Sequence, residues 1–282
     1  MSDLKKWLQS CKVCPNFCNV NRLEGKKGCC RTASEIVISQ SNLHFGEEPV
    51  LVGKAGSGTI FFTACNLECI FCQNYDISHL DYGKFVSPHD LTTIMLFLQQ
   101  SKAENINLVT PTHQAPLIFE SVKMAKKRGL SIPVVYNCGG YENPEFIKEL
   151  DGLVDIYMPD FKYGTNESAL KYSGVKDYTE YCIKSLVEMQ RQVGSLKLDS
   201  RNVAVKGIII RHLVLPENAA DSKKVIDFIA NNISLDTYIN IMDQYRPVYR
   251  ANEYRILRRR PFRYEVEEVI KYARKVGLRR IC

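Results

Sequence analysis

Six short β-rich runs alternate with helix-length segments, and this alternation restricts the fold more than any other feature. The runs cover residues 58–64, 106–110, 133–137, 154–161, 205–216 and 237–245. The segments with helical periodicity cover residues 88–101, 115–128, 143–150, 177–192, 219–231 and 263–276. Strands separated by helices pair in parallel through right-handed crossovers. The pattern therefore predicts an α/β fold. Because six units are too few for a closed eight-unit barrel, we expect a partial, open (β/α)6 barrel.

Polar residues gather directly after these predicted strands. Three cysteines follow the first strand, and TPTH (110–113), NCGG (137–140) and PDFK (159–162) follow the next three. Arg211 and His212 lie within the fifth, and Asp243, Gln244 and Arg246 close the sixth. In parallel α/β folds the active site is built at the carboxyl ends of the strands. We therefore expect a functional site at this edge of the sheet.

The first of these polar stretches, ACNLECIFCQN (64–74), contains three cysteines with the spacing C-x3-C-x2-C, namely Cys65, Cys69 and Cys72. A structural zinc site uses four protein ligands, and a ferredoxin gives each iron of a [4Fe–4S] cluster its own cysteine. Three close thiols therefore indicate a metal site with one position left open for chemistry.

A second group of cysteines lies near the start of the chain. Cys11, Cys14 and Cys18 form a C-x2-C-x3-C run, and Cys30 or Cys29 supplies a fourth thiol. Four thiolates make a closed site that suits either zinc or a second iron–sulfur cluster, and the spacing does not choose between them. Thiols without a metal are the alternative. We expect residues 1–55 to form a Cys-rich metal-binding segment and residues 56–282 to form the main domain.

The composition is that of an ordinary soluble globular protein, with 45% hydrophobic and 24% charged residues. No apolar run is long enough to span a membrane, and the start MSDLKKWLQS has no signal-peptide pattern. We therefore expect a cytoplasmic protein without membrane association. Its eleven cysteines are then better explained as metal ligands and reduced thiols than as disulfides.

The cysteine triad resembles the signature of the radical S-adenosylmethionine (radical SAM) superfamily, C-x3-C-x-aromatic-C after a first β-strand. The stretch GSGTIFFTACNLECIFCQNYDIS, with HFGEEP before it and VDIYMPDFKYG and RHLVLP after it, is similar to the family related to pyruvate formate-lyase activating enzyme. The match covers nearly the whole chain, and the family pattern favours Cys30 as the fourth N-terminal ligand.

The resemblance implies a concrete chemistry. Three thiolates would hold a [4Fe–4S] cluster whose fourth iron binds SAM, and one electron would split SAM into methionine and a 5′-deoxyadenosyl radical. That radical would remove a hydrogen atom from a substrate. The same resemblance assigns cofactor-binding roles to Phe71 beside the adenine and to Asn137, Asp160, Lys162 and Arg211 around SAM.

One stretch departs from the superfamily. Many members carry Gly-Gly-Glu-Pro after the second strand to hold the methionine amino group, whereas this chain has TPTH. The resemblance places His113 where the glutamate would be, so His113 is the expected contact there.

Three hypotheses for function follow. The first is a radical SAM enzyme of unknown substrate, with glycyl-radical activation of a protein as one version. The second is a radical SAM enzyme acting on a small molecule or RNA, and the third is a non-catalytic iron–sulfur electron carrier. The region 246–282 contains twelve Lys and Arg against four Asp and Glu. It could dock an acidic electron donor such as a flavodoxin or ferredoxin, or nucleic acid, although a solvated helix face is the simpler explanation.

Overall fold

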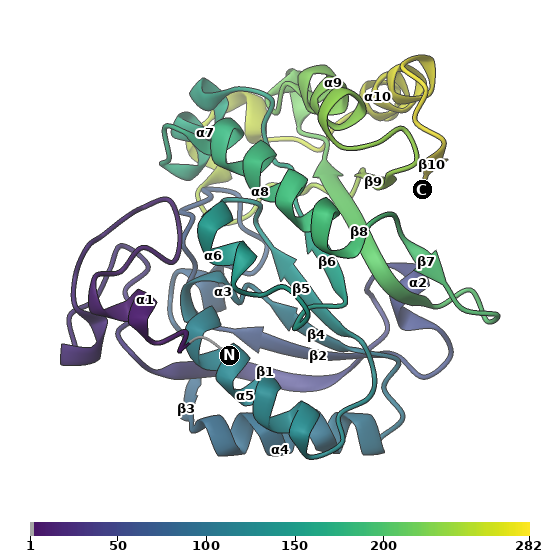
Figure 1. The fold of residues 1–282 in the computed structure, drawn as a ribbon. Coiled ribbons are helices and arrows are strands. Elements are labelled where there is room, and N and C mark those ends of the chain that lie inside the picture. The colour runs from purple at the N-terminus through teal and green to yellow at the C-terminus, as the bar shows by residue number, and fades with distance from the viewer. Residues whose placement is uncertain (1–2) are drawn as a thin grey trace.

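The computed structural model describes residues 3–282, and its central feature is a curved sheet whose middle strands are parallel (Figure 1). All six predicted strands are present. They are β2 (Ser57–Phe62), β4 (Ile106–Val109), β5 (Val134–Cys138), β6 (Ile156–Pro159), β8 (Ala204–Leu213) and β9 (Tyr238–Met242). They are hydrogen-bonded to one another in this order, and every pairing among them is parallel.

Shorter or more polar strands extend the sheet. Strand β1 (Ile36–His44) runs antiparallel to β2 and carries β3 (Lys84–Val86) at its outer edge. Strand β10 (Arg280–Ile281) ends the other side, and β7 (Lys197–Leu198) pairs with β8. In the sheet order of the described residues, β3 and β10 stand at opposite ends, so the sheet is unclosed. The predicted α/β fold with an open partial barrel is confirmed. Strand β1 belongs to the sheet although it lies within residues 1–55.

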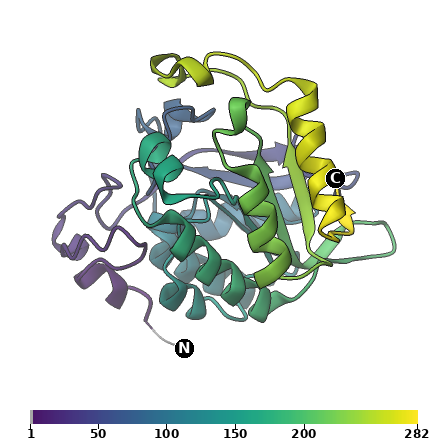
Figure 2. The same ribbon diagram turned by 90° about the horizontal axis from the view of Figure 1, so that it is seen from above.

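The predicted helices are also found, with some changed bounds. They are α4 (Pro88–Gln100), α5 (Ala115–Lys127), α6 (Pro144–Lys148), α8 (Tyr178–Val193), α9 (Ser222–Asn232) and α10 (Arg263–Lys275). Helix α7 (Asn166–Ser173) was not predicted. Helix α4 packs on α5, and α9 packs on both α8 and α10, so the helices form a layer along the sheet (Figures 1 and 2).

The start of α4 shows how the sequence sets a boundary. The Ser87 hydroxyl accepts a hydrogen bond from the Asp90 N–H at 3.1 Å, and the Asp90 carboxylate accepts one from the Ser87 N–H at 3.0 Å. This reciprocal capping satisfies two N–H groups that the first helical turn leaves without partners, and Pro88 at the first helical position needs no partner.

The Cys-rich segment forms an extended lobe beside the sheet, with α1 (Lys6–Gln9) as its first helix (Figure 1). Trp7 packs edge-on against Phe146 of α6, and Asn143 at the start of α6 donates to the Lys12 carbonyl at 2.6 Å. Arg22 is buried and donates to the carbonyl oxygens of Ala33 at 2.9 Å and His113 at 2.7 Å. These contacts fix the lobe against the edge where the parallel strands end.

Between residues 3 and 282, none of the helices has the length and apolar character needed to cross a lipid bilayer.

Candidate functional site

The carboxyl ends of the six parallel strands surround one cavity of about 240 Å³, which we call the inner cavity. Every strand contributes a residue that lines it, either at its end or in the turn that follows. These residues are Cys65, Cys69 and Cys72 after β2, Thr110 after β4, Asn137 of β5, Asp160 and Lys162 after β6, Arg211 of β8, and Met242 and Gln244 at the end of β9. The polar stretches singled out in the sequence therefore converge.

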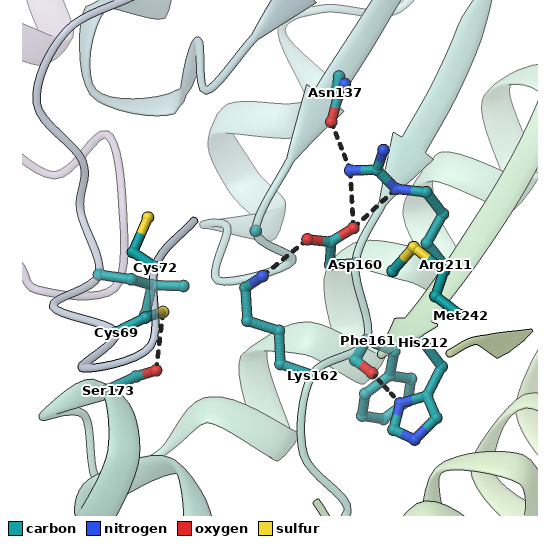
Figure 3. Close-up of polar contacts among 12 residues, drawn as sticks. Cys69, Cys72, Asn137, Asp160, Phe161, Lys162, Ser173, Arg211, His212 and Met242 are labelled. Atoms are coloured by element: carbon teal, nitrogen blue, oxygen red, sulfur yellow. Dashed lines mark hydrogen bonds and ion pairs between the residues drawn. The ribbon is translucent and has the colours of Figure 1, made fainter. Parts of the chain in front are cut away.

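All three cysteines of the triad line the inner cavity, and each sulfur has a hydrogen-bonding partner. The Leu67 N–H donates to Cys65 Sγ at 3.4 Å. The Ser173 hydroxyl donates to Cys69 Sγ at 2.9 Å (Figure 3). Cys72 Sγ lies 3.1 Å from the Ser78 hydroxyl. Donors aimed at sulfur stabilise a thiolate, so the loop suits cysteines that act as ligands.

Burial raises the pKa of Cys65 and of Cys69, and the neighbouring triad thiols raise both further. The Lys162 ammonium opposes this effect at Cys69. Cys69 is buried and Cys65 and Cys72 are partly buried, so thiolates at these three positions would repel one another, and a bound cationic metal centre would relieve that repulsion. The donor set and its burial therefore fit an iron–sulfur cluster.

Two backbone turns around the inner cavity are strained. Ala64, directly before Cys65, has φ of 66°, and Thr110, directly after β4, has φ of 58°. Left-handed conformations are unfavourable for residues with a Cβ, and most of all for β-branched ones. Tertiary hydrogen bonds hold both turns, from the Ala64 N–H to the Ile77 carbonyl at 2.9 Å and from the Thr110 N–H to the Asn137 carbonyl at 2.8 Å. Strain of this kind is common where a fold positions functional groups.

The charged residues of the inner cavity form one hydrogen-bonded chain around Asp160 (Figure 3). Lys162 Nζ donates to one carboxylate oxygen at 2.7 Å, and Arg211 Nε donates to the other at 2.8 Å. Arg211 Nη2 also donates to Asn137 Oδ1 at 2.8 Å. One carboxylate therefore faces two cations, and Glu47, which also lines the inner cavity, lies 3.7 Å from Arg211 Nη1, so two acids balance two bases. Both cations keep N–H groups that Asp160 does not use.

The pKa values follow from this arrangement. Burial alone would raise the pKa of Asp160, but Arg211 and Lys162 hold it below its usual range. Burial alone would lower the pKa of Lys162, but Asp160 and Cys69 raise it. All three groups are therefore charged at neutral pH, and the site is a fixed electrostatic arrangement.

Tyr178 of α8 ties the PDFK turn to the NCGG turn. Its hydroxyl accepts the Lys162 N–H at 2.8 Å and lies 2.9 Å from the carbonyl oxygens of Gly139 and Asp160. The two turns are so close that a Cβ at Gly140, where φ is 79°, would collide with the Asp160 carbonyl. Glycine is required there, and Tyr178 is a positioning residue that the sequence did not reveal.

Phe71, the aromatic residue before the last cysteine of the triad, lines the inner cavity and is 5% exposed. Its ring packs edge-on against Tyr245 at 5.8 Å and Tyr163 at 6.4 Å between ring centroids. The Tyr163 hydroxyl is 2.6 Å from the Ser173 hydroxyl, which in turn contacts Cys69. Phe71 is thus both a packing residue and part of the cavity wall.

His113 does not line the inner cavity. Its ring is buried, and Nε2 donates to the Thr63 carbonyl at 2.7 Å. The TPTH stretch forms a 3-10 turn over Thr112–Gln114, and the Arg22 guanidinium binds the His113 carbonyl from outside. Burial lowers the pKa of His113 to about 3, so the ring is neutral. The structure therefore does not bring His113 together with the other predicted contacts of SAM.

His212 points away from the cavity, because neighbouring residues of a strand face opposite sides of the sheet. Its Nδ1 donates to the Phe161 carbonyl at 2.7 Å (Figure 3). Its Nε2 accepts from the Ser222 hydroxyl at 2.8 Å. Burial lowers the pKa of His212 from 6.5 to about 4. The Arg211–His212 pair is thus divided between the site and the core.

This buried histidine gives a pH prediction. Below about pH 6.5 the unfolded chain binds a proton at residue 212 that the folded chain does not. The free energy of unfolding therefore decreases as the pH is lowered from about 6.5 to about 4. When the pH is lowered from 7 to 5, the free energy of unfolding of the wild type should decrease by about 2 kcal/mol more than that of the variant His212→Gln. Urea unfolding at both pH values measures this. Equal losses would show that residue 212 does not titrate differently on folding.

The N-terminal cysteines lie in one lobe. Cys11, Cys14 and Cys30 are buried, whereas Cys29 is exposed. Burial raises the pKa of Cys14, and the nearby thiols of Cys30 and Cys11 raise it further. Cys18 accepts a hydrogen bond from the Cys29 N–H at 3.3 Å.

Gly28 separates two of these thiols. A Cβ on Gly28 would lie 3.1 Å from Cys18 Sγ and 3.8 Å from Cys30 Sγ, so both sulfurs flank this residue. Over residues 3–282, however, no three His, Cys, Asp or Glu side chains are already arranged around a single ion position. The thiols would have to turn toward one another to bind a metal.

Comparison with known proteins places the chain in a family. The family model described as the radical SAM superfamily matches residues 59–229, which include the cysteine triad, PDFK and Arg211. The chain belongs to the radical SAM superfamily. It is also 34% identical over 284 residues to the uncharacterized protein MJ0674 of Methanocaldococcus jannaschii, covering 97% of this chain and 77% of that protein. The nearer resemblance to pyruvate formate-lyase activating enzyme stays a prediction.

Solved structures share the fold. The chain is similar to Streptococcus suis SuiB bound to S-adenosylmethionine, with a TM-score of 0.51 and 14% identity over 76% of this chain and 46% of SuiB. SuiB bound to the precursor peptide SuiA gives a TM-score of 0.51 and 12% identity, over 76% of this chain and 44% of SuiB. The chain spans less than half the length of SuiB.

Membership of the superfamily identifies the cofactors, because radical SAM proteins use a [4Fe–4S] cluster and SAM and take an electron from a donor. The inner cavity fits these groups by its residue chemistry. It combines three thiols for the cluster with cationic and amide side chains suited to a carboxylate and hydroxyl groups.

Proposed function

We propose that this protein is a radical SAM enzyme that cleaves SAM reductively and uses the resulting radical to remove a hydrogen atom from a substrate. The observation that supports this best is the lining of the inner cavity. Cys65, Cys69 and Cys72 share it with the chain of Asn137, Arg211, Asp160 and Lys162, although these residues come from four separate strands or strand ends. An electron carrier needs no such charged pocket beside its thiols.

In this proposal the triad thiolates hold three irons of the [4Fe–4S] cluster. When bound, the reduced cluster supplies one electron that splits SAM into methionine and a 5′-deoxyadenosyl radical. Lys162 and Arg211 bind the SAM carboxylate through the N–H groups that Asp160 leaves free, and Asn137 and Asp160 orient the polar end of the ligand.

The apolar part of the cavity wall has a separate role. Phe62, Leu67, Phe71 and Val109 line the inner cavity and are buried. They exclude water from the space beside the triad, which protects a reactive radical from side reactions. Phe71 also offers an aromatic ring for contact with adenine.

The direct test is anaerobic reconstitution of the full chain, reduction with dithionite, and detection of 5′-deoxyadenosine and methionine after SAM is added. Formation of both products supports the proposal. An electron carrier would hold a cluster and transfer electrons but would leave SAM intact, so intact SAM under these conditions refutes radical SAM activity for this protein.

Two further parts of the proposal concern partners. An acidic flavodoxin or ferredoxin is the proposed electron donor, since residues 246–282 carry twelve Lys and Arg against four Asp and Glu.

Glycyl-radical activation of a protein remains one version of the function. It predicts that the reconstituted protein generates a glycyl radical on a protein partner, detectable by EPR as a doublet.

The N-terminal cysteines form the second proposed metal site. Cys11, Cys14, Cys18 and Cys30 would close it with four thiolates, so it would leave no position for a substrate and act structurally. In the variant with the triad changed to alanine, we expect zinc or iron to remain bound at this site, measured by elemental analysis of the purified protein. A preparation with neither metal would show that the N-terminal segment is not a metal site.

A further inference from the structure

A second cavity, of about 580 Å³, adjoins the inner cavity, and we call it the outer cavity. The two cavities share lining residues, including Glu47, Phe61, Arg211 and Gln244. The outer cavity is bounded by β1, the start of α2 (Pro49–Val52) and α3 (Tyr75–Ser78). A molecule in the outer cavity would therefore lie directly beside a ligand held at Arg211.

The outer cavity is acidic. Glu47, Glu48 and Asp76 line it, and Arg211 is the single Lys or Arg in its wall. Arg211 is already bound by the Asp160 carboxylate at 2.8 Å, so little of its charge remains to neutralise the three acids. The wall therefore favours a cationic ligand and disfavours an anionic one.

Glu47 carries the most specific signal. Its Oε2 is buried and has no hydrogen-bond partner, and its nearest cation is Arg211 Nη1 at 3.7 Å. By contrast, both oxygens of neighbouring Glu48 accept hydrogen bonds from the Asn240 amide, at 2.8 and 2.9 Å. Buried carboxylate oxygens normally have a donor, because leaving them without one is costly. Glu47 Oε2 thus has an ion-pair partner in Arg211 but no hydrogen-bond donor, and it lies where the two cavities meet.

We infer that the outer cavity binds the hydrogen-donating substrate, and that this substrate is a small organic cation with a primary amine or guanidinium group held by Glu47 and Glu48. This rests on the proposed function. A cavity of about 580 Å³ has the volume of a small-molecule site. An N–H group of the cation supplies the donor that Glu47 lacks, and its charge balances the acidic wall.

Binding of agmatine, an amine and guanidine compound, tests this inference. Isothermal titration of the reconstituted full chain with SAM present should show binding of agmatine and none of glutarate, an anion of similar length. Glu47→Gln should weaken agmatine binding about tenfold to a hundredfold, because a charge-assisted hydrogen bond is lost. Asp76→Asn, which alters an exposed side chain, should cause a smaller loss. Glu180→Gln, on the exposed face of α8, should leave binding unchanged.

The inference would be overturned by the absence of agmatine binding at millimolar concentration, by equal binding of agmatine and glutarate, or by wild-type affinity for agmatine in both Glu47→Gln and Asp76→Asn. If Glu47→Gln weakened SAM binding but not agmatine binding, the free oxygen would serve the SAM amino group and the inference would be wrong.

The inference and the proposed function can fail separately. Agmatine binding without SAM cleavage would refute the function and leave the cation site standing. SAM cleavage without agmatine binding would support the proposed function and refute the cation site. A glycyl radical formed on a protein partner would then identify the alternative substrate.

Discussion

Changing Cys65, Cys69 and Cys72 together to alanine should remove the iron of the inner cavity and abolish SAM cleavage. All three thiols line this cavity, and two of them accept hydrogen bonds from Leu67 and Ser173 that stabilise thiolates. The remaining thiol of the cavity wall, Cys138, cannot supply the three ligands that a cluster needs. The loss of SAM cleavage should therefore be complete, as seen in the yield of 5′-deoxyadenosine, and the visible absorbance due to the triad's cluster should disappear.

Cys282→Ala provides the matched control, because Cys282 is exposed and lies at the far end of the chain from the cavity lining. This variant should keep its cluster and its activity. Cluster absorbance and SAM cleavage at wild-type levels in the triple variant would place the cofactor elsewhere.

Lys162→Ala should weaken SAM binding by about one to two orders of magnitude while the cluster absorbance stays unchanged. Lys162 lies in the cavity, and one of its three N–H donors is used by Asp160 at 2.7 Å. A hydrogen bond to a charged partner contributes about 1.5–3 kcal/mol, and about 1.4 kcal/mol is tenfold in affinity. The fold should tolerate the change because Asp160 keeps its bond to Arg211. Titration of the reconstituted variant with SAM measures the effect.

Lys184→Ala is a closely matched control. Lys184 forms an ion pair of the same length, 2.7 Å, with Glu180, but both side chains are more than half exposed on α8. We expect its SAM affinity to equal that of the wild type. Equal affinities in Lys162→Ala and Lys184→Ala would mean that Lys162 forms only a local ion pair with Asp160.

The sequence was sufficient to predict the parallel strands but not the antiparallel strand β1 at the edge of the sheet. Strands β2 and β4 are almost entirely buried because both faces of the sheet are covered there, and their apolar ends, Ile60–Phe62 and Leu108–Val109, are visible in a single sequence. Strand β1 begins with buried Ile36 and Ile38 and continues through the exposed residues 40–42, so its second half resembles a loop. Its pairing with β2 shows only in three dimensions.

Site residues that directly follow a strand could mostly be predicted, whereas those that reach the site from a helix could not. The cysteine triad and PDFK follow directly after strands, so their place at the sheet edge followed from the fold class. Ser173 and Tyr178 reach the site from α7 and α8 through long-range packing, which no local pattern reports. His113 also follows a strand, yet the turn that carries it buries its ring beneath Thr63.

The position of Glu47 beside Arg211 could not be predicted for a different reason. Glu47 belongs to HFGEEP, a stretch whose sequence predicts neither a strand nor a site residue, and it lies far from Arg211 in the chain. The antiparallel hairpin of β1 and β2 returns the chain across the sheet edge and brings Glu47 to 3.7 Å from Arg211. Sequence reasoning could not foresee this contact because β1 itself was not predicted.

The most direct test of the account is the EPR spectrum of the reduced, anaerobically reconstituted protein with and without SAM. If Cys65, Cys69 and Cys72 hold a [4Fe–4S] cluster with one iron free of protein ligands, SAM binds that iron and changes the g values and line shape of the cluster signal. We expect this change in the wild type and in Cys282→Ala. A cluster signal that stays the same at saturating SAM would contradict the account, because it would mean that every iron already has a protein ligand or that SAM does not reach the cluster.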